Sequence, residues 1–398
     1  MQQSKIILPI IIISQFFCTS LWFAGNGVVT DLILNFNLQG SALAHLTSAV
    51  QFGFIIGTLC FAVFSIADLF SPSKVFFVCA CIGAAFNLGV LYDENSLSSL
   101  LLLRFFTGFF LAGIYPVGMK IAVDHFEKGL GKSLSFLVGA LVLGTALPHF
   151  LKNTTAAFSW KFVLLSTSTL ACIGGFLILL FVPDGPFRKP GKKVNIVAFS
   201  QVFKNREFRL SAFGYFGHMW ELYAFWAFTP VILTSFVEKH PQSHLNVSLW
   251  SFAIIGVGSI SCVIGGYLAQ RWGTKQTAFA SLLFSCICCL ISPLVFTTNS
   301  EVFFLSFLLI WGMLVIADSP LFSTMIAKNA PDTIKGTALT IVNCIGYAIT
   351  IVSIQTINEL QSLTDSNAVY SILAIGPLLG LVALRLKNKN STTGPKQH

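Results

Sequence analysis

The sequence has 398 residues, of which 55% are hydrophobic and only 10% are charged, and its mean hydropathy is +0.80. Soluble domains average about 25% charged residues, so this composition excludes a large soluble domain and predicts a multi-pass membrane protein. The net charge of +9 does not indicate a nucleic-acid partner, because the charges lie in short loops between apolar runs, where they orient a membrane protein.

Twelve apolar runs are long enough for membrane-spanning helices, which need about 20 residues each. The first run continues past Leu34 and is therefore too long for the apolar core of a signal peptide. The first six predicted spans are Ile6–Leu34, His45–Ile66, Lys74–Tyr92, Leu97–Val123, Lys132–Leu151 and Trp160–Val182. The last six are Phe208–Phe236, Ser248–Leu268, Lys275–Phe296, Val302–Lys328, Gly336–Thr356 and Ala368–Leu386. We therefore expect an all-α membrane protein with twelve transmembrane helices.

Lys and Arg residues are distributed unequally between the two sides of these spans. With both termini in the cytoplasm, 20 of the 24 fall on the inner side, three fall on the outer side, and Arg104 lies within a span. This bias predicts that both termini are cytoplasmic. The polar stretch Pro183–Arg209 lies midway and divides the spans into two groups of six. The predicted parts are an N-terminal half over residues 1–182, a cytoplasmic linker over 183–207 and a C-terminal half over 208–398.

Three short matches indicate that the two halves are copies of one another. Asp68, in the loop after the second span, aligns with Gln270, in the loop after the eighth, at an offset of 202 residues. Pro116 of the fourth span aligns with Pro320 of the tenth at an offset of 204. The sequence GKSL, which follows the fourth span, aligns with GTAL, which follows the tenth, at an offset of 205. Parallel six-helix halves are a known transporter architecture.

The sequence GGYLAQRWGTK, at Gly265–Lys275, resembles the loop motif of the major facilitator superfamily, Gly-x-x-x-Asp-Arg-x-Gly-x-Lys. The matching positions are Gly266, Arg271, Gly273 and Lys275, whereas Gln270 replaces the acid. The first-half copy retains Asp68 and Lys74. In the fourth span, RFFTGFFLAG resembles the superfamily's Arg-x-x-x-Gly pattern through Arg104 and Gly108.

The resemblance implies a twelve-helix transporter in which the loop residues Asp68, Gly266, Arg271, Gly273 and Lys275 gate the cytoplasmic side. The alternative is that the charges in these loops only orient the protein in the membrane.

Three charged residues lie well inside spans: Arg104, Glu221 and Asp318. An ionised side chain at the bilayer centre costs about 2.5–3.5 kcal/mol on insertion scales, so each is expected to face a cavity or a partner. In the superfamily, the first, fourth, seventh and tenth helices line the central cavity, and these three residues fall in the last three of those helices. Arg104 and Glu221 are predicted at similar depths, which allows an attraction across the halves. The partner of Arg104 is thus expected to be an acid or an anionic substrate.

The stretch GHMWELY places His218 and Glu221 three residues apart on a helix, so both project from one side of it. We interpret them as a substrate and proton site in which Glu221 carries the coupling proton and Asp318 is the rival acid. The alternative is a structural hydrogen bond. Trp22, Trp220 and Tyr223 are predicted to line the cavity with aromatic rings.

Asn26 is a further candidate, either as a cavity contact or as a helix–helix hydrogen bond.

The favoured function is a secondary transporter of a small organic solute, working by alternating access and coupled to protons. A non-transporting receptor or assembly protein on the same fold is the alternative. No nucleophile–base pair or phosphate-binding loop is visible, so we expect neither an enzyme nor ATP drive, and no cofactor. The cluster of Cys286, Cys288 and Cys289 has no His or acid beside it, so no metal site is expected. The expected surroundings are membrane lipid, in the cell membrane (the inner membrane of a bacterium), with the chain as a monomer.

The charge bias generates a topological prediction. In a cysteine-free background, Lys192→Cys is expected to resist an impermeant thiol reagent added outside whole cells, because residues 183–207 are cytoplasmic. The same variant is expected to react in inverted vesicles, which serve as its control. Labelling in intact cells would contradict the predicted orientation.

Overall fold

The computed structural model describes residues 3–126, 130–154, 159–188, 202–331, 335–364 and 366–385. Within these ranges every regular element is a helix. Eleven helices there are long and apolar enough to cross a membrane, and a shorter apolar helix, Ile6–Thr19, belongs to the first predicted span. The all-α multi-pass fold is thereby confirmed. The middle of the predicted linker, residues 189–201, lies outside the described residues, and the domain boundaries stay predictions.

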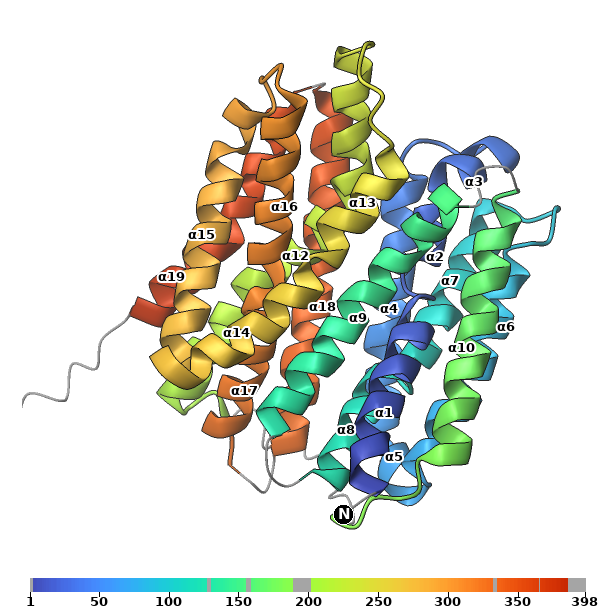
Figure 1. Cartoon of the computed structure of the whole chain (residues 1–398), viewed down its shortest axis with the longest axis vertical. Helices are drawn as coiled ribbons and strands as arrows, with labels where there is room; N and C mark the ends of the chain where they lie inside the picture. Colours follow the sequence, from blue (N-terminus) through green and yellow to red (C-terminus); the bar gives the residue numbers. More distant parts are fainter. Residues whose placement is uncertain are drawn as a thin grey trace, which may run out of the picture.

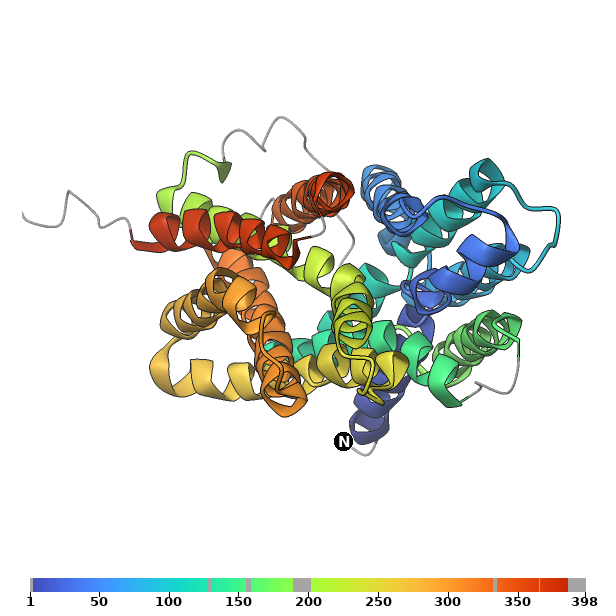
Figure 2. The same ribbon diagram turned by 90° about the horizontal axis from the view of Figure 1, so that it is seen from above.

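The helices form two groups that lie side by side (Figures 1 and 2). The first contains α1 (Gln3–Thr19), α2 (Ala24–Gly27), α3 (Val29–Asn35), α4 (Ala42–Val63), α5 (Ile66–Leu69), α6 (Pro72–Gly89), α7 (Leu97–Leu111), α8 (Tyr115–His125), α9 (Leu130–Thr154) and α10 (Lys161–Phe181). The second contains α12 (Arg206–Lys239), α13 (Val247–Gly256), α14 (Gly258–Trp272), α15 (Thr274–Val295), α16 (Glu301–Ala317), α17 (Ser319–Asn329), α18 (Lys335–Leu363), the 3-10 helix η1 (Asn367–Ala374) and α19 (Ile375–Arg385).

Several predicted spans consist of more than one helix. The first is divided into α1, α2 and α3, the fourth into α7 and α8, the eighth into α13 and α14, and the tenth into α16 and α17. Pro116 and Pro320 stand in the first turns of α8 and α17, where a missing N–H is tolerated but a continuous preceding helix is not. Each break frees backbone carbonyls inside the membrane, and these need hydrogen-bond donors.

The main contacts between the halves are those of α4 with α18 and of α9 with α13 and α14. Gln355 of α18 donates to Ser48 of α4 over 2.8 Å. Asn246, at the start of α13, donates to Asn153 in the last turn of α9 over 2.6 Å. Polar contacts of this kind join helices in lipid, where burial of apolar surface gives no driving force between them.

Glycines bring α4 and α7 into backbone contact. Gly53 of α4 lies against the carbonyl of Phe105, and Gly108 of α7 lies against the carbonyl of Val50. A Cβ at either position would collide with backbone atoms, which cannot move aside as a flexible side chain can. This close approach places Arg104, four residues before Gly108, deep within the first half.

Gly108→Ala is therefore expected to destabilise the protein by about 1–3 kcal/mol, because the added methyl group forces α4 and α7 apart. The measurement is the apparent melting temperature of the purified protein in detergent. Gly40→Ala is the matched control, since no atom lies within 4 Å of a Cβ built there. Equal melting temperatures for the two variants would contradict the proposed backbone contact.

Candidate functional site

Arg104 is buried in the first half with an exposed fraction of 1%. Its two terminal nitrogens donate to the carbonyl of Leu21, each over 3.2 Å, and Nη2 also donates to the carbonyl of Trp22 over 2.6 Å. Both carbonyls belong to the break between α1 and α2. The expected attraction between Arg104 and Glu221 does not occur in this structure, because the arginine's hydrogen bonds go to the broken helix.

Asn87 of α6 extends this polar network, and sequence reasoning missed it. Its Oδ1 accepts from Arg104 over 3.1 Å. Its Nδ2 donates to Ser168 over 2.9 Å and to Thr167 over 3.2 Å, both on α10. The network thus connects the first, third, fourth and sixth spans. An amide inside an apolar helix is a signal that could have suggested it.

Glu221 of α12 points into the interior of the second half. Its Oε1 accepts from Ser285 Oγ of α15 over 2.5 Å and from Trp311 Nε1 of α16 over 2.6 Å. The side chain is 1% exposed. These bonds match the structural alternative for this residue, since they attach the seventh span to the ninth and tenth.

His218 pairs with Asp318 instead of lying with Glu221. The separation between His218 Nδ1 and Asp318 Oδ1 is 2.8 Å, and each side chain is 1% exposed. Three residues of an α-helix turn through about 300°, so the side chains of His218 and Glu221 diverge by about 60° and meet different neighbours. Asp318 stands at the junction of α16 and α17, where its carbonyl accepts from the amides of Leu321 and Phe322.

The His218–Asp318 pair is incompletely satisfied. His218 Nε2 and Asp318 Oδ1 have no aligned hydrogen-bond partner among the described residues, although the pair is within ion-pair distance. The rings of Tyr215 and Phe322 lie near the imidazole, each with its centroid 6.0 Å away. A buried acid and base with spare bonding capacity can exchange a proton when water reaches them.

Trp22 and Tyr223 meet where the two halves touch. Their ring centroids are 5.8 Å apart with an interplanar angle of 30°. Tyr347 of α18 stacks on Trp22 at 5.6 Å, and its hydroxyl lies 3.0 Å from that of Tyr223. Phe54 of α4 contacts both Trp22 and Tyr347. We call these rings, together with Trp226, which lies 5.2 Å from Tyr223, the central aromatic cluster.

Trp220, predicted to line the same cavity, lies elsewhere. It is half-buried, and its Nε1 donates to the carbonyl of Ile372 over 3.2 Å. With Phe213 and Gly217 it borders an apolar groove of about 620 Å³ between α12, α18 and α19. Trp220 and Tyr223 lie about 60° apart around α12, and their side chains meet different neighbours.

Asn26 of α2 makes a helix–helix contact. Its Nδ2 donates to Thr47 Oγ1 of α4 over 2.8 Å, and its side chain is buried. This geometry matches the helix–helix hydrogen bond, one of the two roles predicted for Asn26.

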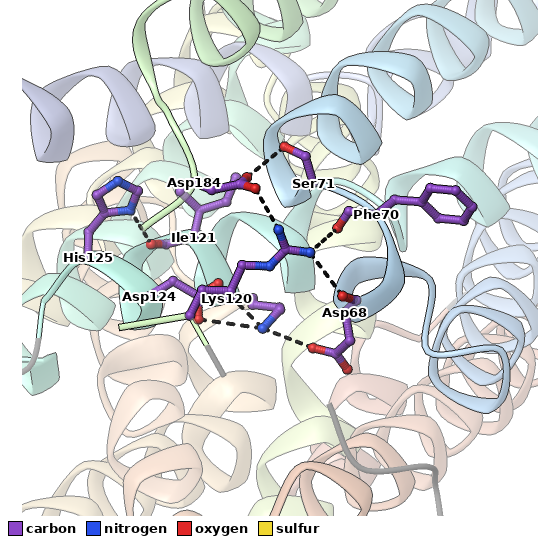
Figure 3. Close-up of polar contacts among 9 residues, drawn as sticks. Asp68, Phe70, Ser71, Lys120, Ile121, Asp124, His125 and Asp184 are labelled. Atoms are coloured by element: carbon purple, nitrogen blue, oxygen red, sulfur yellow. Dashed lines mark hydrogen bonds and ion pairs between the residues drawn. The ribbon is translucent and has the colours of Figure 1, made fainter. Parts of the chain in front are cut away.

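Asp68 lies in a group of charged side chains (Figure 3). Its helix, α5, lies at the end of the bundle where the N-terminus lies (Figure 1). Lys120 of α8 pairs with Asp68 at 3.0 Å and with Asp124 at 3.4 Å. Arg188, which follows α10, pairs with Asp184 and donates to the carbonyls of Asp68 and Phe70 over 2.9 and 2.7 Å. Ser71 donates to Asp184 over 2.6 Å. All these bonds join the loop after the second span, the end of the fourth span and the first residues of the linker after the sixth, without reaching the second half.

The second-half loop residues have different surroundings. Gly273 ends α14 with a φ of 91°, a left-handed conformation that favours glycine. Gly266 lies against Ser135 of α9, so it packs across the two halves. Lys275 lies 3.8 Å from Glu207, and Arg271 is exposed. Sequence similarity between the two loops therefore does not produce the same contacts.

No group of three or more potential metal-ligating side chains occurs in the part of the chain that the structure describes. Cys286, Cys288 and Cys289 are free and buried. The interior of the protein thus contains a buried ion pair, His218–Asp318, and a cluster of stacked aromatic rings.

Arg104→Met is expected to lower the free energy of unfolding by about 2 kcal/mol or more, because hydrogen bonds to a charged group typically contribute about 1.5–3 kcal/mol. The measurement is thermal unfolding of the purified variant. Lys120→Met is the control, because its partly exposed pairs at the bundle end contribute less. An equal loss of stability in Lys120→Met and Arg104→Met would show that the bonds of Arg104 to the helix break stabilise the protein no more than a partly exposed ion pair does.

Comparisons with known proteins identify the family and the fold. The family described as the Major Facilitator Superfamily matches residues 11–354. The MFS-type transporter acdC of Aspergillus candidus is 27% identical over 154 residues, which are 37% of this chain. The aligned region covers only 29% of that relative's length.

Two solved structures share the fold at low sequence identity. A mutant form of the nucleoside transporter NupG has a TM-score of 0.71 at 15% identity, covering 95% of this chain and 98% of that one. A bacterial homologue of the human lysosomal transporter Spinster, inward-facing and unoccupied, has a TM-score of 0.66 at 14% identity, covering 96% and 94%. Because the family match extends over most of the sequence, this chain belongs to the Major Facilitator Superfamily of membrane transporters.

Proposed function

We propose that this transporter moves a small organic solute by alternating access and is driven by protons, with the His218–Asp318 pair as the proton-carrying site. The observation that carries this proposal is the 2.8 Å separation of the two buried side chains at the break between α16 and α17. Transporter binding sites are commonly built at such breaks near the bilayer midplane.

The pair holds one proton without net charge. With His218 protonated and Asp318 ionised the charges cancel, whereas gain or loss of a proton leaves an uncompensated charge. An uncompensated charge in the bilayer costs about 2.5–3.5 kcal/mol or more. Protons are therefore exchanged only in states in which water reaches the pair. When the cavity closes and excludes water, the pair holds one proton and is neutral.

Proton loss would act on the helix break in the tenth span. The pair attaches α12 to the junction of α16 and α17, which is the discontinuous part of the tenth span. Breaking the pair removes this attachment while Glu221 still holds α12 to α15 and α16. Movement of α17 relative to α16 at this junction would then link loss of the proton to opening of the cavity on one side of the membrane.

Glu221 supports the rival role less well. Ser285 and Trp311 donate to its Oε1, and both belong to the second half. A carboxylate satisfied in this way stabilises the packing of one half, whereas coupling requires a group whose contacts change during transport. We therefore assign the coupling proton to Asp318 and a positioning role to Glu221.

The charges around Asp68 are proposed to brace the first half. The bonds of Asp68, Lys120 and Arg188 hold together the inner ends of three spans of the first half. A half braced in this way moves as a unit, as alternating access requires. We further propose a monomer in the cell membrane, surrounded by lipid, with both termini cytoplasmic.

Asp318→Asn is expected to lose solute accumulation driven by a pH gradient while retaining counterflow, because a permanently neutral side chain resembles one state of the cycle. Glu221→Gln is expected to retain driven accumulation and to melt at a lower temperature. A metabolite that stabilises the wild-type protein in a thermal screen supplies the radiolabelled solute, and both assays use proteoliposomes.

His218→Ala serves as the second test of the pair and is expected to shift the pH dependence of accumulation. The reverse pattern, with accumulation lost in Glu221→Gln and retained in Asp318→Asn, would overturn the assignment of the proton to Asp318.

A further inference from the structure

The central aromatic cluster is divided between the two halves. Trp22 and Phe54 come from the first half, whereas Tyr223, Trp226 and Tyr347 come from the second. The ring of Trp22 lies nearly parallel to those of Tyr223 and Tyr347, with interplanar angles of 30° and 25°. Alternating access separates the halves, so these stacked faces separate during each cycle.

Polar atoms in and beside the cluster have no protein partner. Trp22 Nε1, Trp226 Nε1 and both amide atoms of Gln51 make no hydrogen bond to any described residue. Their exposed fractions are between 0 and 1%. Gln51 precedes Phe54 by three residues on α4, so the two side chains lie on the same side of that helix. Unpartnered buried groups are rare in native proteins, and each requires an explanation.

A purely structural role accounts less well for them. Rings that only close the passage need no hydrogen-bond donors. Asn26 and Asn87 show that buried amides here can find helix–helix partners, although the amide of Gln15 on α1 has none among the described residues. Two indole donors, together with an amide that both donates and accepts, suit a ligand that carries complementary groups on its edge.

The groups of the cluster itself carry no charge. The terminal nitrogens of Arg104 donate to the carbonyls of Leu21 and Trp22, and Asp318 pairs with His218. The cluster therefore offers stacking faces and neutral hydrogen-bonding groups of its own.

We propose that the central aromatic cluster is the substrate subsite and that the substrate is a neutral, planar heteroaromatic compound with hydrogen-bonding groups on its ring edge. Its ring inserts against Trp22 when the halves separate, and its edge bonds to the indole Nε1 atoms and to the amide of Gln51. This inference rests on the proposed transport function and specifies its substrate class.

The test compares flat and saturated rings that are uncharged and carry matching hydrogen-bonding groups. Nicotinamide and uracil are titrated against the purified protein in detergent, beside tetrahydropyran-3-carboxamide and 5,6-dihydrouracil, with the melting temperature as readout. The aromatic probes are expected to raise the melting temperature in a saturable manner, because a ligand that binds only the folded state stabilises it. The saturated compounds are expected to have no effect at the same concentrations.

Three variants locate the binding. Trp22→Phe keeps a stacking ring but loses the donor, and Gln51→Leu loses the amide; each is expected to weaken binding about tenfold or more, as losses of buried hydrogen-bonding partners do. Trp220→Phe is the matched control, because Trp220 lies in the groove between α12, α18 and α19. This variant is expected to bind the probes as the wild type does. If one test variant fails to fold, the other still decides.

The proposal is overturned if neither aromatic probe stabilises the protein, if the saturated rings bind equally well, or if Trp22→Phe and Gln51→Leu both bind as the wild type does. Binding is measured at equilibrium without a pH gradient, so it does not depend on proton coupling. A protein that couples protons through Asp318 but does not bind either ring would overturn this inference alone.

Discussion

The guanidinium of Arg104 is the interaction on which the first half depends. A broken helix inside a membrane leaves carbonyls that water cannot reach, and those of Leu21 and Trp22 are satisfied by this one side chain. Asn87 in turn holds the guanidinium and reaches the sixth span. The break in the first span, the position of Trp22 and the contact between four spans therefore share one polar network.

The second half satisfies its buried charges differently. Glu221 is held by two neutral donors, whereas Asp318 meets a titratable base at a helix break. Two acids of similar burial thus have distinct chemical surroundings. In the proposed mechanism this difference favours Asp318, because its partner can also change its charge in a medium that excludes isolated ions.

The two halves are joined through different kinds of contact at different places. Polar bonds connect α4 with α18 and α9 with α13. Stacked rings connect them at the centre, where Trp22 meets Tyr223 and Tyr347. The charges around Asp68, by contrast, stay within the first half. A strongly braced half that meets its partner through rings and a few hydrogen bonds is suited to rigid-body motion, because few strong bonds must break at the interface.

The sequence by itself determined that the chain is a multi-pass helical membrane protein of the major facilitator type. Hydropathy and composition suffice for this because the bilayer requires long apolar helices with satisfied backbones. The sequence also identified Arg104, Glu221 and Asp318 as buried charges, since any charge within a span is conspicuous.

Only the tertiary structure decided which of these residues meet. Helical spacing placed His218 beside Glu221, but a divergence of about 60° sends one to Asp318 and the other to Ser285 and Trp311. Trp220 and Tyr223, also three residues apart on this helix, meet different neighbours as well, the apolar groove and the central aromatic cluster. The partners of Arg104 were equally hidden, because they are backbone carbonyls exposed by a helix break, and every residue has a carbonyl. Pairing depends on the rotation and breaks of neighbouring helices, which no local pattern in the sequence records.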